Sequence, residues 1–172
     1  MLARTVRDRV RDIVDYPSAG VVFKDITPLL ADGVAFAQVI DGFAGSFGGN
    51  VDLVVGIEAR GFILAAPVAV RLGAGFVPIR KAGKLPHVTV GAAYELEYGT
   101  AEIEVHTDGI LPGQRVLVID DVLATGGTAA AACELVERVG GVVAGLAVLM
   151  ELTFLGGRAR LAGRQVRALV EV

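Results

Sequence analysis

The chain has 172 residues, of which 53% are hydrophobic and 20% are charged. This size and composition predict one folded domain with a substantial core and exclude a disordered chain. Its formal net charge at pH 7 is −3, so it lacks the basic field of a nucleic-acid-binding protein and the polybasic signal of a membrane-surface protein.

The N-terminal part of the chain predicts two helices separated by an extended segment. Through residues 3–14, apolar residues recur at helical spacing between arginines and aspartates, which is typical of an amphipathic helix. Turn residues end this helix and bound a short extended segment over 20–28. Phe23 lies in that segment and is, on sequence grounds alone, a core aromatic residue. A second helix is expected over 34–47.

A strand, a turn and a helix come next. Residues 51–57 predict a buried strand, and residues 62–72 predict a helix. The turn between them contains Arg60 among small residues, at the carboxyl end of the strand. Open α/β sheets bind ligands at that end, so we expect Arg60 to contact a ligand.

The next predicted strand, over 76–79, also ends in charge. It runs into a basic loop whose cations are Arg80, Lys81 and Lys84. Such a loop is usually only solvated, but this one follows a strand of the same predicted sheet. We therefore expect it to bind an anion, and we expect the loop over 82–93 to act as a lid.

A β-hairpin is predicted around Gly99-Thr100, with strands over 94–98 and 101–106. The hairpin should project from the main sheet. Three glutamates of the hairpin are expected to be solvated, as most hairpin glutamates are; they are Glu97, Glu102 and Glu104.

The most informative stretch is residues 116–128. Four apolar β-forming residues end in Asp120 and Asp121, and a short linker leads to Thr125-Gly126-Gly127-Thr128 and an alanine-rich run. This order predicts a buried parallel strand, a tight loop and the start of a helix. The free N–H groups of a helix N-terminus attract an anion, glycines let the backbone approach it, and threonine hydroxyls add donors.

We expect this loop to hold one phosphate group. Adjacent carboxylates repel a phosphate, so Asp120 and Asp121 must face something else, either a sugar diol or a Mg²⁺ ion. A phosphate site beside a diol site predicts a ribose 5-phosphate ligand. The loop lacks the spacing and the lysine of a nucleoside-triphosphate P-loop. The alternative is a strand, turn and helix with a structural role only.

Two further strands complete a fold of the α/β class. They are predicted over 142–150 and 166–172. Strands that alternate with helices along the chain predict a central, mostly parallel sheet flanked by helices. The N-terminal segment and the hairpin are expected to cover the carboxyl edge of this sheet, and no linker indicates a second domain.

We expect the chain to be cytoplasmic. Its longest apolar stretches, 61–70 and 139–150, are too short to span a bilayer, and its first residues do not resemble a signal peptide. The single cysteine, Cys133, excludes an internal disulfide and a cysteine-based zinc site. It falls in the helix after the phosphate loop and is expected to be a small buried hydrophobic residue.

The stretch 116–128 resembles the signature that binds 5-phosphoribosyl 1-pyrophosphate (PRPP) in the type I phosphoribosyltransferases. Other segments resemble the adenine-specific branch of that family, and they are Gly20–Ile26, Glu58–Phe62, Arg80–Pro86 and Tyr94–Gly99. The resemblance implies the type I phosphoribosyltransferase fold over residues 1–172. It also implies a small hood, formed by about 15–30 and the hairpin, and a lid loop and hairpin over about 81–107.

The resemblance implies a pentosyl transfer of purine salvage, in which adenine and PRPP give AMP and pyrophosphate. It also implies a homodimer and a requirement for Mg²⁺, held mainly through PRPP and not by direct protein ligands. Breaking the C1–O bond of PRPP places positive charge on the ribose and negative charge on pyrophosphate. Cations at the leaving group and exclusion of water favour such a reaction.

By the same resemblance, residues of the signature bind the sugar and its phosphate. Asp120 and Asp121 would hold the ribose hydroxyls, and Ala124–Thr128 would hold the 5-phosphate. The cations expected to face pyrophosphate are Arg60, Arg80, Lys81 and Lys84. A strained or cis peptide is expected at Glu58–Ala59.

Phe23 would stack on adenine, with backbone groups of Val22 and Lys24 reading the edge of the base. Glu97 is our candidate for the proton transfer at adenine. The chain departs from the family pattern at two positions. Lys24 stands where arginine is frequent, and Ala93 stands where a serine is expected, which removes any hydrogen bond from that side chain to a closing lid.

Two alternatives remain open. The same chemistry could act on hypoxanthine, guanine or xanthine, although the segment 20–26 favours adenine. A regulator of the same fold would instead bind PRPP or nucleotides and control nucleic-acid partners without turnover. Such a regulator would be expected to carry an added nucleic-acid-binding domain or a strongly basic face.

Overall fold

The structure is a computed structural model, and it describes residues 2–47, 50–95 and 99–172. None of the helices in these ranges is long and apolar enough to cross a membrane. The elements, in chain order, are α1 (Leu2–Arg7), β1 (Arg11–Val14), β2 (Val22–Asp25), α2 (Thr27–Ala31), α3 (Gly33–Ser46), β3 (Leu53–Ile57), α4 (Arg60–Leu72), β4 (Gly75–Lys81), β5 (Thr89–Glu95), β6 (Thr100–His106), β7 (Arg115–Leu123), α5 (Gly127–Arg138), β8 (Val142–Glu151), the 3-10 helices η1 (Thr153–Leu155) and η2 (Gly157–Leu161), and β9 (Val166–Glu171).

The main sheet has seven strands in the order β5-β6-β4-β3-β7-β8-β9. The strands from β4 to β9 in this order are parallel, whereas β5 and β6 form an antiparallel hairpin that joins the sheet through β4. The prediction of a central, mostly parallel sheet is confirmed. β7 lies between β3 and β8, and its residues Val116–Ile119 are fully buried, because both faces of a parallel sheet are covered.

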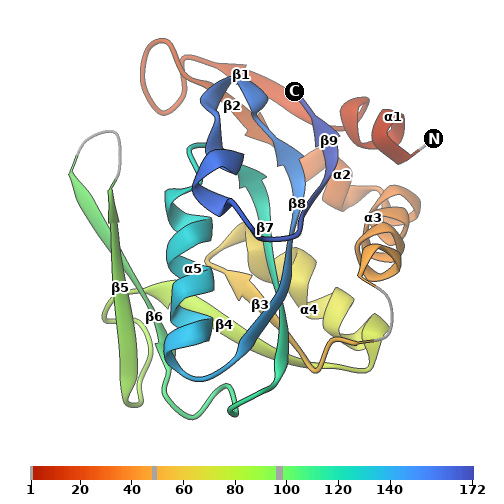
Figure 1. The fold of residues 1–172 in the computed structure, drawn as a ribbon. Coiled ribbons are helices and arrows are strands. Elements are labelled where there is room, and N and C mark those ends of the chain that lie inside the picture. Colours follow the sequence, from red (N-terminus) through yellow and green to blue (C-terminus); the bar gives the residue numbers. More distant parts are fainter. Residues whose placement is uncertain (1, 48–49, 96–98) are drawn as a thin grey trace.

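Helices cover both faces of this sheet (Figure 1). On one face, α5 and the β5–β6 hairpin share an apolar core with Val116 and Val118 of β7. On the other face, α3 and α4 share a second core with Leu117 and Ile119. This alternation follows from the two-residue period of side chains along a strand. β7 therefore carries Asp120 and Asp121 past these apolar residues toward the carboxyl edge of the sheet.

The predicted helix over 3–14 is wrong in its second half. α1 ends at Arg7, and Arg11–Val14 form a strand that pairs antiparallel with β2. Pairing with a later segment overrides the local helical spacing: Val6 is fully buried, whereas Val14 is 68% exposed. We call β1, β2 and the turn between them the hood, which lies at the end of the molecule where β7 and β8 finish (Figure 1).

The hairpin is longer than predicted. β5 begins at Thr89, so residues 89–93, which we had expected in the lid loop, are paired with β6. Gly91 and Ala92 weaken the strand pattern in the sequence, but their backbones lie opposite Glu104 and Ile103 in the ladder. We call the segment over 80–88 the basic loop.

Candidate active site

The acidic pair lies at the carboxyl end of β7, as predicted. Asp121 is only 5% exposed, and its Oδ2 lies 2.8 Å from Nη2 of Arg60. The two groups are close enough for an ion pair but are not aligned for a hydrogen bond. Asp120 accepts a hydrogen bond from the backbone N–H of Asp121 through Oδ1 (2.9 Å). Burial and the neighbouring Asp121 carboxylate raise the pKa of Asp120 well above its ordinary value.

A glycine that sequence reasoning missed lets α4 begin against this pair. A Cβ on Gly61 would lie 2.9 Å from the carbonyl oxygen of Ile119 and 3.1 Å from Oδ1 of Asp120. A larger residue would push the helix away from the end of β7. Gly61 follows Arg60 directly, so the same close approach brings the Arg60 guanidinium to Asp121. The Glu58–Ala59 peptide, just before them, is cis as predicted.

The loop over Ala124–Thr128 lies directly after β7 and leads into α5. Gly126 precedes the helix with a positive φ of 83°, and no side chain in the described part of the chain caps the helix N-terminus. The first N–H groups of α5 therefore remain available to an anion. A small cavity of about 70 Å³ lies here, lined by Asp120 and residues 122–129. We call residues 124–128 the phosphate loop.

Gly157 supports the phosphate loop from outside the signature, and sequence reasoning did not find it. A Cβ on Gly126 would overlap the carbonyl oxygen of Gly157, and a Cβ on Gly157 would overlap that of Ala124. The two backbones thus pack against each other with no room for a side chain. Only the tertiary approach of η2 to the loop reveals this requirement.

Arg60 joins the hood to the acidic pair. Its Nη1 donates to the carbonyl oxygen of Lys24 (3.1 Å), and its guanidinium carbon lies 4.6 Å from the centre of the Phe23 ring. The Phe23 ring also meets Tyr16 edge to face at 5.2 Å. Residues expected at adenine and at ribose are therefore neighbours, although the chain separates them widely.

A cavity of about 610 Å³ adjoins the hood. Val22 and Lys24 line it, and Lys24 is held by an ion pair with Asp12 at 2.7 Å. The opposite wall comes from the segment around η1, through Leu152, Phe154 and Leu155. Sequence reasoning missed these three residues, because nothing in their local pattern indicates that β8 ends beneath the hood.

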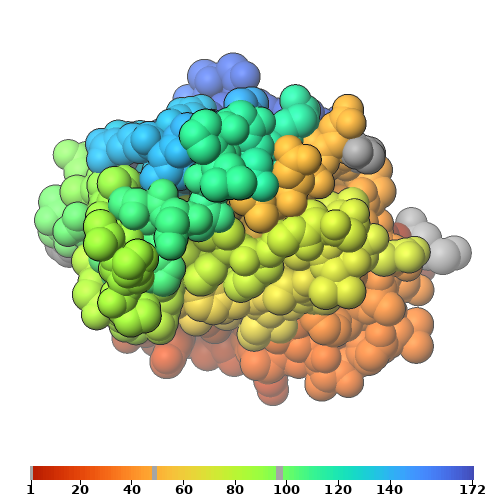
Figure 2. All heavy atoms as spheres, turned by 90° about the horizontal axis from the view of Figure 1, so that it is seen from below, coloured from red at the N-terminus to blue at the C-terminus, as the bar shows by residue number. Residues whose placement is uncertain are grey.

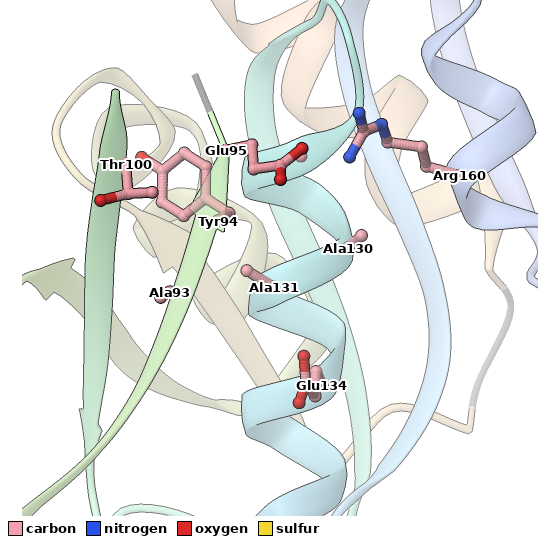
Figure 3. A pocket seen from close by; sticks show the side chains of 9 residues that line it. Ala93, Tyr94, Glu95, Thr100, Ala130, Ala131, Glu134 and Arg160 are labelled. Atoms are coloured by element: carbon pink, nitrogen blue, oxygen red, sulfur yellow. The ribbon is translucent and has the colours of Figure 1, made fainter. Parts of the chain in front are cut away.

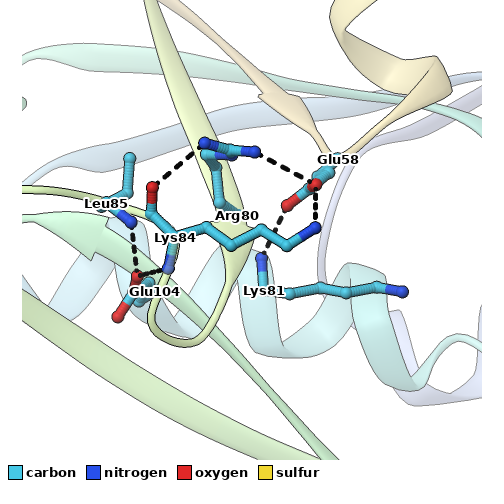
Figure 4. A network of polar contacts seen from close by, with 6 residues as sticks. All are labelled: Glu58, Arg80, Lys81, Lys84, Leu85 and Glu104. Atoms are coloured by element: carbon cyan, nitrogen blue, oxygen red, sulfur yellow. Dashed lines mark hydrogen bonds and ion pairs between the residues drawn. The ribbon is translucent and has the colours of Figure 1, made fainter.

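Two cationic side chains of the basic loop, those of Arg80 and Lys84, converge on Glu58, whereas the Lys81 ammonium points away from it (Figure 4). Glu58 accepts hydrogen bonds from Nζ of Lys84 (2.9 Å), Nη2 of Arg80 (3.3 Å) and the backbone N–H of Lys81 (3.0 Å). Arg80 also donates from Nη1 to the carbonyl oxygen of Lys84 (3.0 Å). Two of the three predicted cations, Arg80 and Lys84, are thus held at one carboxylate by their side chains, whereas Lys81 contacts it only through its backbone N–H. This carboxylate precedes Arg60 by two positions.

The expectation that Glu104 is solvated is wrong. Glu104 is only 7% exposed. Its carboxylate accepts hydrogen bonds from the backbone N–H groups of Lys84 (3.1 Å) and Leu85 (3.0 Å) and from the Thr89 hydroxyl (3.1 Å). The Leu85 N–H and these other donors lower the pKa of Glu104 below its ordinary value. Glu102, two positions earlier on β6, is exposed as expected.

Stability at acidic pH should report on Glu58. The Lys84 ammonium, the Lys81 N–H and Arg80 lower the pKa of Glu58 from 4.5 to about 2 in the folded chain. The unfolded chain therefore binds this proton first, and the stabilisation is complete above about pH 4.5 and lost between about pH 4.5 and about pH 2. Urea unfolding at a series of pH values should show a shallower loss of stability over this window for Glu58→Gln than for the unaltered protein. Equal slopes would contradict the assignment.

A second cavity, of about 320 Å³, lies between the hairpin and α5. Tyr94 and Glu95 line it from β5, Gly127 lies at its edge, and Glu95 and Arg160 extend toward one another across it (Figure 3). A Cβ on Gly127 would lie 3.2 Å from the carbonyl oxygen of Glu95, so the hairpin directly adjoins the phosphate loop. Glu97, our candidate for proton transfer, lies outside the described residues and stays a prediction.

The acidic residues fit Mg²⁺ only as a partner of substrate phosphates. Among the residues that the structure describes, no three His, Cys, Asp or Glu side chains gather into a metal cage. Mg²⁺ commonly binds through one or two carboxylates together with substrate phosphates. Asp120 and Asp121, beside the phosphate loop, are a donor set of that kind.

The chain belongs to the phosphoribosyl transferase family, because the phosphoribosyl transferase domain matches residues 26–164. Curated relatives of the chain carry a more specific name than the domain family. A protein of Thermobifida fusca named adenine phosphoribosyltransferase is 62% identical over 170 residues, covering 98% of this chain and 97% of that one. A protein of the same name from Streptomyces coelicolor is 63% identical over 169 residues, covering 95% and 93%.

Solved structures of proteins with the same name have a fold similar to that of this chain. Adenine phosphoribosyltransferase of Thermoanaerobacter pseudethanolicus superposes with a TM-score of 0.96 and is 48% identical, with all of both chains covered. The enzyme of Saccharomyces cerevisiae, solved with adenine and an imino-altritol bisphosphate, superposes with a TM-score of 0.92 at 38% identity and 98% coverage of both chains. The predicted type I phosphoribosyltransferase fold is confirmed.

Proposed function

We infer that this chain transfers the 5-phosphoribosyl group of PRPP to adenine, giving AMP and pyrophosphate. One observation in the structure carries the substrate assignment. Arg60 contacts Asp121 while it lies over Phe23 and binds the backbone of Lys24, so the residues proposed to bind the base adjoin those proposed to bind the ribose. The relatives named adenine phosphoribosyltransferase, and the yeast enzyme solved with adenine, support the same substrate.

The signature residues bind the sugar phosphate in this proposal. N–H groups at the start of α5 and the hydroxyls of Thr125 and Thr128 donate to the 5-phosphate. Asp120 and Asp121 accept from the ribose hydroxyls, and Ala124, Gly126 and Gly127 let the backbone approach the phosphate. The uncapped N-terminus of α5 and its neighbouring small cavity support these roles.

The basic residues stabilise the leaving group. Adenine N9 attacks C1 of the ribose, the C1–O bond breaks, and pyrophosphate departs with the electron pair. Arg60, Arg80, Lys81 and Lys84 are proposed to neutralise the negative charge that develops on it. The side chains of Arg80 and Lys84 share one carboxylate, Glu58, and this supports their role, because two cations that share one anion can bind another.

The adenine ring is proposed to stack on Phe23, with backbone groups of Val22 and Lys24 at its edge. The proton that N9 loses passes to Glu97, or a proton reaches N7 from it. The cavity beside the hood supports the base site through Val22 and Lys24 and adds Leu155 and Phe154 as apolar neighbours, although Phe23 is not among the residues that line it. The basic loop and the hairpin are proposed to act as a lid that excludes water from the reacting groups.

Mg²⁺ would be held mainly by PRPP, with Asp120 and Asp121 nearby, and when bound it would neutralise charge on the diphosphate. We also propose that the chain is a single domain over 1–172, with the hood and lid as parts of it, acting in the cytoplasm. The chain has a single cysteine, Cys133, which is free and buried, and this agrees with a compartment in which disulfides are rare.

A direct assay tests the function. The purified protein is incubated with PRPP, Mg²⁺ and, in turn, adenine, hypoxanthine, guanine or xanthine, and nucleotide and pyrophosphate are measured. We expect AMP from adenine alone, and no product when a chelator removes Mg²⁺. Turnover of another base would overturn the adenine assignment but not the sugar-phosphate site. Binding of PRPP without turnover of any base would favour a regulator.

We propose that the chain forms a homodimer through α4 and β4. These elements make a broad band, yellow to yellow-green, across one face of the molecule (Figure 2). Ile63 and Val70 are one heptad apart on α4 and are 44% and 82% exposed, and Phe76 on β4 is 37% exposed. Large exposed apolar side chains that share a face are typical of a protein interface.

Ile63→Asp should convert the dimer into a monomer. The new charge would be buried in the interface without a partner, whereas an acidic residue in the first turn of α4 does not disfavour the helix itself. Light scattering after size-exclusion chromatography measures the mass. Val34→Asp is the matched control, because Val34 is 72% exposed in the first turn of α3 and outside this band. A dimer that survives Ile63→Asp would contradict the proposed interface.

A further inference from the structure

Two carboxylates hold the basic loop, and they do so in different ways. Glu58 binds mainly the cationic side chains of Arg80 and Lys84. Glu104 binds the backbone of the loop, through the N–H groups of Lys84 and Leu85, and the hydroxyl of Thr89 where the loop enters β5. Lys84 is therefore held at its main chain by one carboxylate and at its ammonium by the other (Figure 4).

The contacts of Glu58 are open to exchange with another anion. The side chains of Arg80 and Lys84 remain 34% and 48% exposed while they bind it. A pyrophosphate group offers the same kind of acceptor with more charge, so it can replace Glu58 as the partner of both cations. Glu58 thus resembles the ligand that the loop is prepared to receive.

The contacts of Glu104 are not open to such exchange. The residue is 7% exposed and lies within β6, opposite Arg80 of β4 and Gly91 of β5 in the two ladders. Its donors are backbone groups and a neutral hydroxyl, which a pyrophosphate bound by the lysine and arginine side chains would not take over. Glu104 therefore keeps the shape of the loop whether or not Glu58 has released its cations.

We propose that Glu104 is a positioning residue for pyrophosphate: it fixes the backbone of the basic loop so that Lys84 and Arg80 meet the leaving group together. The proposal rests on the proposed function for the identity of that group. Glu104 would act only through other residues, because its carboxylate faces the backbone of the basic loop and not the substrate.

Binding of pyrophosphate in the presence of Mg²⁺, measured by titration calorimetry, tests the proposal without turnover. Glu104→Gln should raise the dissociation constant for pyrophosphate by about tenfold or more, because an amide in place of the charged acceptor loses much of its hold on the two N–H groups. Glu102→Gln makes the same change on an exposed neighbour of the same strand and should leave the constant within about twofold.

A double-mutant cycle separates positioning from general destabilisation. If Glu104 acts through Lys84, then Glu104→Gln should add little to the loss that Lys84→Ala causes alone. Additive losses, or an unchanged constant for Glu104→Gln, would overturn the proposal. Thr89→Val removes one donor and leaves the fold of the strand intact. It should raise the constant by about two- to fivefold, and no change would likewise count against the proposal if Glu104→Gln does not fold.

The adenine assay distinguishes this inference from the proposed function. Suppose that the unaltered protein binds pyrophosphate but does not convert adenine, and that the variants give the expected non-additive cycle. The proposed function then fails and the role of Glu104 stands. If adenine is converted and the cycle is additive, the function stands and the role of Glu104 is overturned. A protein that does not bind pyrophosphate overturns the role of Glu104, and the adenine assay then decides the function separately.

Discussion

Gly126→Ala is expected to raise KM for PRPP on the order of 100-fold, because displacement of a binding group by about 1 Å can have an effect of that size. Gly126 has a φ of +83°, which disfavours any residue with a Cβ by about 1–2 kcal/mol. The added Cβ would also overlap the carbonyl oxygen of Gly157. The phosphate loop must then move away from η2, and its N–H groups lose their alignment with the 5-phosphate. Steady-state kinetics with PRPP varied at saturating adenine measures the effect.

Gly156→Ala is the matched control for this substitution. Gly156 also has a positive φ, of 65°, but a Cβ there meets nothing within 4 Å. Backbone strain alone should therefore lower the free energy of unfolding by about 1–2 kcal/mol and leave KM for PRPP nearly unchanged. If both variants raise KM equally, strain near η2 and not the packing of Gly126 against Gly157 is the cause.

Asp121→Asn is expected to lower kcat/KM for PRPP by about 10- to 150-fold. Hydrogen bonds to a charged group are worth about 1.5–3 kcal/mol, and the ribose hydroxyls would lose such an acceptor. The substitution also leaves Arg60 without its counter-charge at 2.8 Å. The Arg60 guanidinium then loses one of the contacts that hold it against the hood, so KM for adenine should rise as well.

Asp41→Asn makes the same chemical change elsewhere. Asp41 forms an ion pair with Arg71 at 2.7 Å on the surface, where the Asp41 side chain is 59% exposed and the Arg71 side chain is 62% exposed. An exposed pair of this kind contributes about 0–1 kcal/mol, and we expect unaltered kinetics. Wild-type kcat/KM for Asp121→Asn would contradict the role of this carboxylate at the ribose.

The parts of the site that could be predicted from the sequence are those whose chemistry is local. Asp120, Asp121 and the phosphate loop follow one another within a strand, a turn and a helix start, so their spacing alone indicates what they can bind. Arg60 is recognisable for the same reason, because it lies at the end of another strand of the sheet. Each of these predictions needs only the direction of a strand, which periodicity supplies.

The parts that could not be predicted depend on contacts between distant segments. The β1 strand forms because it pairs with β2, although its own spacing favours a helix. Glu104 has the same local pattern as the exposed Glu102, and only the return of the basic loop onto β6 buries it. Gly157 and Leu155 act through their approach to the phosphate loop and the hood. Local sequence carries no information on such approaches.

The position of Arg60 would link the two proposed substrate sites thermodynamically. One guanidinium lies over Phe23 and also faces Asp121, so a ligand that engages Asp121 changes the electrostatic environment of the ring on which the base would stack. If PRPP alters the affinity for adenine by some factor, adenine must alter the affinity for PRPP by the same factor. The hood and the acidic pair would then act as one cooperative unit, in which the charge balance of a single arginine sets how strongly each substrate affects the affinity for the other.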